Sequence, residues 1–145
     1  MQIVEDGKLK KYIVIVSVVL FVLSLTQKSY CTTTSCGDSI MALLLGWAGI
    51  LSGAAGLTWF ANPLLLACWI TMRKNLKAAM FLSVAATLLS GSFLLFDSIK
   101  DNEGGIPHQI ITYKPGYWLW LGSCATMLLG TFWLMLRYNT RMAAK

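Results

Sequence analysis

The sequence predicts an all-α integral membrane protein, a bundle of four transmembrane helices formed as a single domain over residues 1–145. The mean hydropathy is +0.65, and charged residues make up only 12% of the chain, about half of the share that is usual in soluble domains. Four apolar runs alternate with polar segments. A chain this apolar cannot cover a surface that faces water, so we expect lipid to be its solvent.

The first predicted span covers residues 11–27. Its uncharged centre is short for a crossing that needs roughly 20 residues, but Lys10 and Lys11 can extend it by reaching toward the headgroups. A basic start before a short apolar run also resembles a signal peptide. Because no convincing small-residue cleavage site follows the run, we expect an uncleaved helix.

The second run, residues 40–72, carries no charge; it is too long for one crossing and too short for two. Trp47 and Trp69 are spaced like the two interfacial aromatic belts. We therefore expect a crossing over residues 47–70, with an extension from residue 40 outside it. Pro63 removes a backbone donor within this helix, which predicts a kink there.

The remaining spans are predicted over residues 78–96 and 117–136, which leaves outer loops at residues 28–39 and 97–116. The second half of the longer loop is apolar and aromatic enough to dock on the first loop as a cap, and a mobile loop is the alternative.

The lysines and arginines orient this bundle, because cytoplasmic segments carry an excess of them. Both ends of the chain and the turn at residues 73–77 hold nine basic residues, against three in the two outer loops. This bias predicts that both termini are cytoplasmic and, for a bacterial chain, that the protein lies in the inner membrane.

A stripe of small residues in the second run predicts a packing seam. Its steps of four and three residues place all members on one helix face, where the missing side chains let a second backbone come close. The sequence leaves open whether this seam closes one monomer or joins a homo-oligomer. The residues are Ala42, Gly46, Gly49, Gly53 and Gly56.

Two of the four cysteines, Cys31 and Cys36, lie in the first outer loop. The predicted topology exposes this loop to an oxidising compartment, so we expect a structural disulfide. Reduced cysteines and thiol–disulfide catalysis are the alternatives, but small four-helix membrane oxidoreductases use a Cys-x-x-Cys pair that this chain lacks. Cys68 and Cys124 lie in apolar spans and are interpreted as packing thiols.

The sequence predicts neither an enzyme nor a cofactor or metal site. A metal site needs a cluster of ligands, and His108 is the only histidine; serine or cysteine catalysis would need a base and a group that orients it. Between the end residues of the predicted spans there is no acidic or basic residue, which disfavours proton-coupled transport. The basic residues form no stripe with interleaved aromatics, so nucleic-acid binding is not expected.

Two sequence elements resemble a group of small, uncharacterised bacterial inner-membrane proteins. The first is Trp-x-Ala-Asn-Pro-Leu, in the segment GWAGILSGAAGLTWFANPLLLACWI at residues 46–70. The second is Gly-Tyr-x-Leu-Trp, in the segment YKPGYWLWLGS at residues 113–123. The resemblance covers the last three spans; it implies a bacterial source and a four-helix fold, and it transfers no activity and no site residue.

We therefore predict a non-enzymatic inner-membrane protein that acts through helix and loop contacts, as an accessory subunit or as a membrane-acting immunity or defence component. Its expected partners are the lipid bilayer and either further copies of the chain or another membrane protein. The alternative is a passive pore or a binding site for a small apolar ligand at the kink of the second helix. The residues expected to form that site are Trp59, Asn62 and Pro63.

Overall fold

The computed structural model describes residues 2–51, 53–100 and 106–143, with the side chains of residues 2–5 and 51 left outside the description. Within these ranges the chain forms five α-helices, three 3₁₀ helices and four strands. The α-helices are α1 (Gln2–Leu25), α2 (Ser39–Leu45), α3 (Ala61–Thr71), α4 (Leu76–Ser92) and α5 (Pro115–Ala143). The 3₁₀ helices are η1 (Ala48–Leu51), η2 (Ala54–Phe60) and η3 (Phe93–Leu95). The strands are β1 (Lys28–Thr32), β2 (Cys36–Asp38), β3 (Ser98–Ile99) and β4 (His108–Tyr113).

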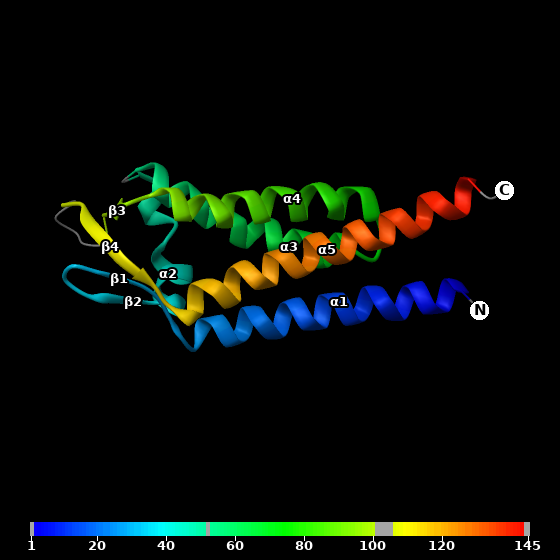
Figure 1. Cartoon of the computed structure of the whole chain (residues 1–145), viewed down its shortest axis with the longest axis horizontal. Coiled ribbons are helices and arrows are strands. Elements are labelled where there is room, and N and C mark those ends of the chain that lie inside the picture. The colour runs from blue at the N-terminus through cyan, green and yellow to red at the C-terminus, as the bar shows by residue number, and fades with distance from the viewer. Residues whose placement is uncertain (1, 52, 101–105, 144–145) are drawn as a thin grey trace.

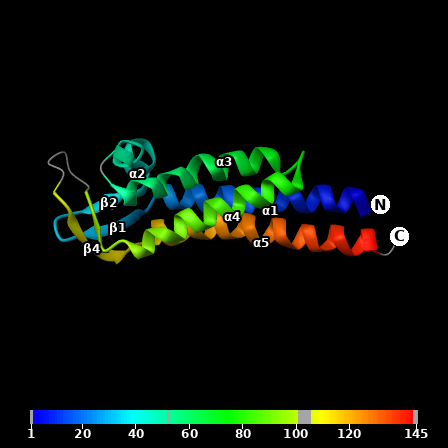
Figure 2. The same ribbon diagram turned by 90° about the horizontal axis from the view of Figure 1, so that it is seen from above.

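Four long helical units lie side by side in alternating directions: α1, η2 continued by α3, α4, and α5 (Figures 1 and 2). Both ends of the chain and the turn between α3 and α4 lie at one end of the bundle, which we call the basic pole. The strands and α2 lie at the opposite end, the strand pole. The three segments that hold most of the basic residues therefore meet at a single pole.

In the described part of the chain, three helical stretches are long and apolar enough to cross a membrane: Ala54–Thr71, Leu76–Leu95 and Pro115–Ala143. Helix α1 is not among them. Lysines at positions 8, 10 and 11 leave only its second half without charge. The crossing predicted over residues 11–27 is therefore the weakest of the four by composition.

Small hydroxyl groups join the helices across the bundle. Ser17 of α1 and Ser123 of α5 form a reciprocal pair, in which each hydroxyl donates to the other residue's carbonyl oxygen, at 3.0 and 2.8 Å. The Trp69 indole of α3 donates to the Ser17 hydroxyl at 2.9 Å. The hydroxyls of Ser83 in α4 and Thr131 in α5 lie 3.0 Å apart. Because lipid cannot satisfy polar groups, such pairs hold neighbouring helices in register.

The prediction of an all-α fold with four helices is incomplete, because the outer loops form a four-stranded antiparallel sheet of order β2-β1-β4-β3 and the predicted extension from residue 40 forms the short helix α2. Strand β1 from the first loop pairs with β4 from the second. Strand β4 reads HQIITY, and its β-branched and aromatic residues favour a pleated surface. The predicted cap over the bundle is therefore a sheet; residues 101–105 of the longer loop lie outside the described ranges.

The prediction of one long helix over residues 47–70, kinked near Pro63, is wrong. Helix α2 ends at Leu45, two short 3₁₀ helices follow, and regular α-helix begins only at Ala61. Pro63 lies in the first turn of α3, and the Trp59 carbonyl oxygen four residues before it, which its missing N–H cannot reach, accepts from the Asn62 side chain instead. The glycines upstream explain the break, since glycine is a poor helix former and allows tight turns.

Candidate ligand cavity at the strand pole

A cavity of about 840 Å³ lies at the strand pole. Its walls come from the end of α1, from α2, from the η1–η2 segment and from the start of α5. The volume lies within the range of small-molecule sites, and most of the lining is apolar or aromatic. The lining residues on which the site depends are Phe21, Ser39, Ala42, Trp59, Asn62 and Trp120.

Glycines shape the wall of the cavity that the η1–η2 segment forms. The Trp59 indole donates to the Leu43 carbonyl oxygen at 2.8 Å, which ties η2 to α2. A Cβ atom on Gly46 would overlap the Trp59 ring, and one on Gly56 would overlap the Gly49 carbonyl group. The chain therefore folds back on itself here, and Gly49 packs against Gly56 of the same segment.

The predicted stripe of small residues consequently does not lie on one helix face, because its members are spread over α2, η1, η2 and the turns between them. All five members line the cavity instead. Their shared property, the absence of a large side chain, leaves the space empty and permits the tight reversal of the backbone.

Asn62 forms a polar bridge on one side of the cavity. Its side chain is 7% exposed, and its amide nitrogen donates to the Trp59 carbonyl oxygen at 3.0 Å. The Trp120 indole of α5 donates to the Asn62 Oδ1 atom at 2.9 Å. Asn62 thus satisfies the last turn of η2 and couples α3 to α5, while both indole rings remain part of the cavity wall.

Ser39 contributes a polar group without a partner. Its side chain is 8% exposed, and its hydroxyl oxygen has no hydrogen-bond partner in the described part of the chain. The residue lines the cavity and contacts Gly116, on which a Cβ atom would overlap the Ser39 hydroxyl. A buried hydroxyl group without a partner costs free energy; because Gly116 covers this oxygen, it meets a ligand atom only after the Ser39 side chain turns toward the cavity.

An aromatic cluster closes the cavity toward α4. The Tyr117 ring contacts the Phe93 ring at a centroid distance of 5.7 Å, and its hydroxyl donates to the Ser90 carbonyl oxygen at 3.0 Å. Tyr113 of β4 contacts Phe93 as well, at 5.9 Å. Burial raises the pKa of Tyr113, with a smaller contribution from Asp97. The Tyr113 phenol therefore stays protonated and donates to the Phe93 carbonyl oxygen at 3.2 Å.

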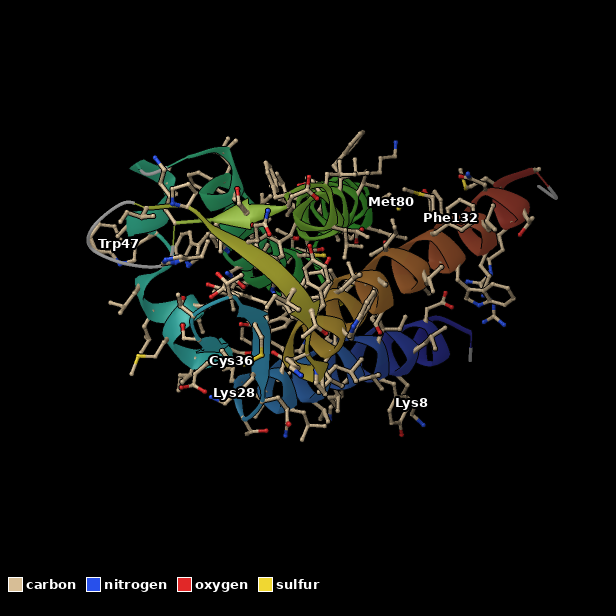
Figure 3. The ribbon with its side chains drawn as sticks, turned by 60° about the vertical axis from the view of Figure 1, so that its left-hand side comes forward. Lys8, Lys28, Cys36, Trp47, Met80 and Phe132 are labelled. Atoms are coloured by element: carbon tan, nitrogen blue, oxygen red, sulfur yellow. A yellow bond between two sulfur atoms is a disulfide. The ribbon has the colours of Figure 1, made fainter. Side chains whose placement is uncertain are left out.

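The first hairpin covers the cavity and carries the disulfide. Cys31 and Cys36 are bonded, which confirms the predicted pair. Lys28 and Asp38 form an exposed ion pair at 3.4 Å beside it. Figure 3 shows Lys28 and Cys36 on neighbouring strands of the hairpin, and Trp47 at the periphery beyond α2. Trp47 is 55% exposed, which agrees with a position at a membrane interface.

Two of the three residues predicted for a ligand site lie in the cavity wall. Trp59 and Asn62 line the cavity, whereas Pro63 is exposed and does not line it. Sequence reasoning missed Ser39 and Trp120. Trp120 stands out in the sequence only as the last residue of the Gly-Tyr-x-Leu-Trp element, and nothing in the sequence indicates that Ser39 is buried.

The structure brings no metal-ligand cluster together: within the described ranges, no three His, Cys, Asp or Glu residues are close enough to hold an ion. Cys68 and Cys124 are reduced and buried between the helices.

No family model matches the chain, and no significant match is found among curated proteins or solved structures. The geometry of the cavity is therefore the ground on which a function is assigned.

Proposed function

We propose that this chain is a non-enzymatic multi-pass membrane protein that binds a small apolar or amphipathic molecule in the cavity at the strand pole. The observation that carries the proposal is the combination of an apolar cavity of about 840 Å³ with one buried hydroxyl group that lacks a partner. Ligand sites are typically apolar concavities with a few polar groups that fix orientation.

The polar groups of the lining define the ligand further. The indoles of Trp59 and Trp120 already donate to protein oxygens, as does the amide of Asn62. Ser39 is left to bond a ligand hydroxyl or carbonyl oxygen once its side chain turns from Gly116 toward the cavity. A ligand with one apolar chain and one neutral polar end, such as a medium-chain alcohol, fits this inventory better than a multiply charged molecule.

The membrane arrangement is part of the proposal. We take α1 as the fourth crossing, because it packs along α5 and reaches α3 through Trp69. With the basic pole in the cytoplasm of a bacterial cell, the cavity lies at the outer surface of the inner membrane and the disulfide in the oxidising compartment. We expect an alkaline phosphatase fused after residue 145 to be inactive. An active fusion would contradict this orientation.

The sequence-based prediction of a protein that acts through helix and loop contacts stays a prediction. Apolar side chains on the outer face of α1, such as Val16 and Val22, are about half exposed, and lipid alone accounts for such a surface.

Ligand binding can be tested with a medium-chain alcohol that carries a photoreactive diazirine. The full chain in lipid nanodiscs is illuminated with this probe, and the labelled peptides are mapped by mass spectrometry. We expect labels on the cavity lining that an excess of unmodified alcohol removes, and labels on lipid-facing residues that it leaves. Labelling of the lining that cannot be saturated would contradict the proposal.

A pair of variants on α2 sharpens this test. Ala42 and Leu44 are both exposed, but only Ala42 lines the cavity. Ala42→Phe should fill part of the cavity and lower saturable labelling by roughly tenfold, the size expected when a ligand loses a well-shaped apolar contact. Leu44→Phe should leave labelling unchanged. Equal effects of the two substitutions would show that the probe reports on the lipid-facing surface.

A further inference from the structure

A second pocket, of about 510 Å³, lies at the basic pole, far from the cavity. Its lining comes from the first part of α1 and from the turn between α3 and α4. The lining residues are Asp6, Gly7, Lys10, Lys11 and Arg73.

Unequal helix lengths create this pocket. Helices α1 and α5 extend past the turn between α3 and α4 (Figures 1 and 2). The first part of α1 consequently has α5 beside it but no helix on the side of the turn, and Arg73 projects from the turn to line that side. Gly7 leaves open space, because a Cβ atom built on it meets nothing within 4 Å.

The charge of the pocket is strongly positive. Among the described lining residues the acidic one is Asp6, which is held by the guanidinium of Arg141: Nη1 bonds Oδ2, and Nη2 lies 3.3 Å from Oδ1. Within the described residues, Lys10, Lys11 and Arg73 form no ion pair. Among the described lining residues, three cations therefore face one pocket while the Asp6 carboxylate is already neutralised.

The pocket also lies at the level where headgroups are expected. The span Ala54–Thr71 ends just before Arg73, and the span Leu76–Leu95 begins just after it. In α1 the uncharged half begins directly after Lys11. The cations of both segments thus mark the same membrane boundary, where lipid phosphates are found.

We propose that this pocket binds a phosphate group, and that its source is the headgroup of an anionic phospholipid. An arginine fork and flexible lysine ammonium groups are the side chains that suit phosphate oxygens. The bound lipid would fasten α1 to the α3–α4 turn, a side of the bundle where protein contacts are sparse. This site is independent of the cavity at the strand pole.

The test uses the full chain in detergent, with bound lipid counted by native mass spectrometry. Short-chain phosphatidylglycerol is compared with phosphatidylcholine of equal chain length and with inorganic phosphate. We expect one phosphatidylglycerol to bind at least tenfold more tightly than phosphatidylcholine, since each basic side chain near a lipid surface strengthens anion binding. Equal binding of the two lipids would overturn the proposal. Inorganic phosphate that binds as tightly as phosphatidylglycerol would show that the bound phosphate group need not come from a lipid, which would overturn that part of the proposal.

Two double variants distinguish binding in the pocket from a general attraction of the lipid to the basic pole. Lys10→Gln with Arg73→Gln removes two cations of the pocket, whereas Lys8→Gln with Lys74→Gln removes two exposed cations of the same pole that do not line it. The first variant should lose phosphatidylglycerol binding by roughly tenfold or more, and the second should change it by less than about twofold. Circular dichroism confirms that both retain their helices. Equal losses would mean that net charge, and not the pocket, attracts the lipid.

Discussion

The two poles of the bundle are built by different physical means. At the strand pole, segments distant in sequence pair through backbone hydrogen bonds, a disulfide, and glycine contacts that admit no side chain. At the basic pole, two helix ends and one short turn meet through exposed charges, and Asp6 of α1 pairs with Arg141 of α5. Substitutions should therefore change the free energy of unfolding strongly at the strand pole and weakly at the basic pole, because exposed charges are screened by solvent.

The largest effect is expected at the glycine contact. Gly56→Ala places a Cβ atom against the Gly49 backbone, which cannot move as a flexible side chain could. We expect a loss of about 2–4 kcal/mol or a failure to fold, as for severe overpacking. Gly91→Ala is the matched control, because its Cβ atom would meet nothing within 4 Å. Thermal unfolding in detergent measures both, and similar behaviour of the two variants would argue against the backbone reversal.

A smaller loss is expected at the polar bridge. Asn62→Leu removes the acceptor of the Trp120 indole and the donor to Trp59, which should cost about 1–3 kcal/mol for buried groups left unpaired. Thr71→Val, in the same helix, removes a hydroxyl that bonds only to carbonyl groups of α3 itself. Chemical unfolding should show at most a small loss of stability for this control. A loss as large as that of Asn62→Leu would argue against a specific role of the Asn62 bridge.

The contrast between the poles also explains what the sequence could predict. Apolar run length depends on local composition, so it correctly indicated three long apolar helices, and the position of Cys31 and Cys36 in an outer loop indicated the disulfide. The sheet depends on pairing between residues about 80 positions apart, such as Tyr30 with Tyr113, which periodicity cannot reveal. The glycine steps were compatible with one helix face, and only the fold-back of the chain determines their actual partners.

Ser39→Ala should change the stability of the ligand-free protein in the opposite direction. Removing a buried hydroxyl that has no partner relieves a desolvation cost, so the ligand-free protein should gain roughly 1 kcal/mol or remain unchanged. The same substitution should weaken alcohol binding, because the ligand loses its polar contact. Melting temperatures with and without the alcohol separate the two effects. A destabilised ligand-free protein with unchanged affinity would assign Ser39 a structural role.

The smallest effect is expected at the ion pair of the basic pole. The hydrogen bond from Arg141 lowers the pKa of Asp6 below its ordinary value of 3.8. The charged form is favoured in the folded protein, so the contribution is present above about pH 4 and is lost as the pH falls through the lowered pKa. Asp6→Asn should cost only a few tenths of a kcal/mol at neutral pH. Unfolding curves of both proteins should converge in acid; a difference that grows in acid would contradict this assignment.

The central claim, that the cavity at the strand pole takes up a ligand, is tested most directly by the indole NMR signals of the chain's six tryptophans. Trp59 and Trp120 line the cavity, whereas Trp133 is 55% exposed on α5 and contacts Arg137. On titration with a medium-chain alcohol, the signals of Trp59 and Trp120 should shift together and saturate, while that of Trp133 stays in place. Parallel, unsaturated shifts of all three, or no shift of the cavity pair, would contradict the account.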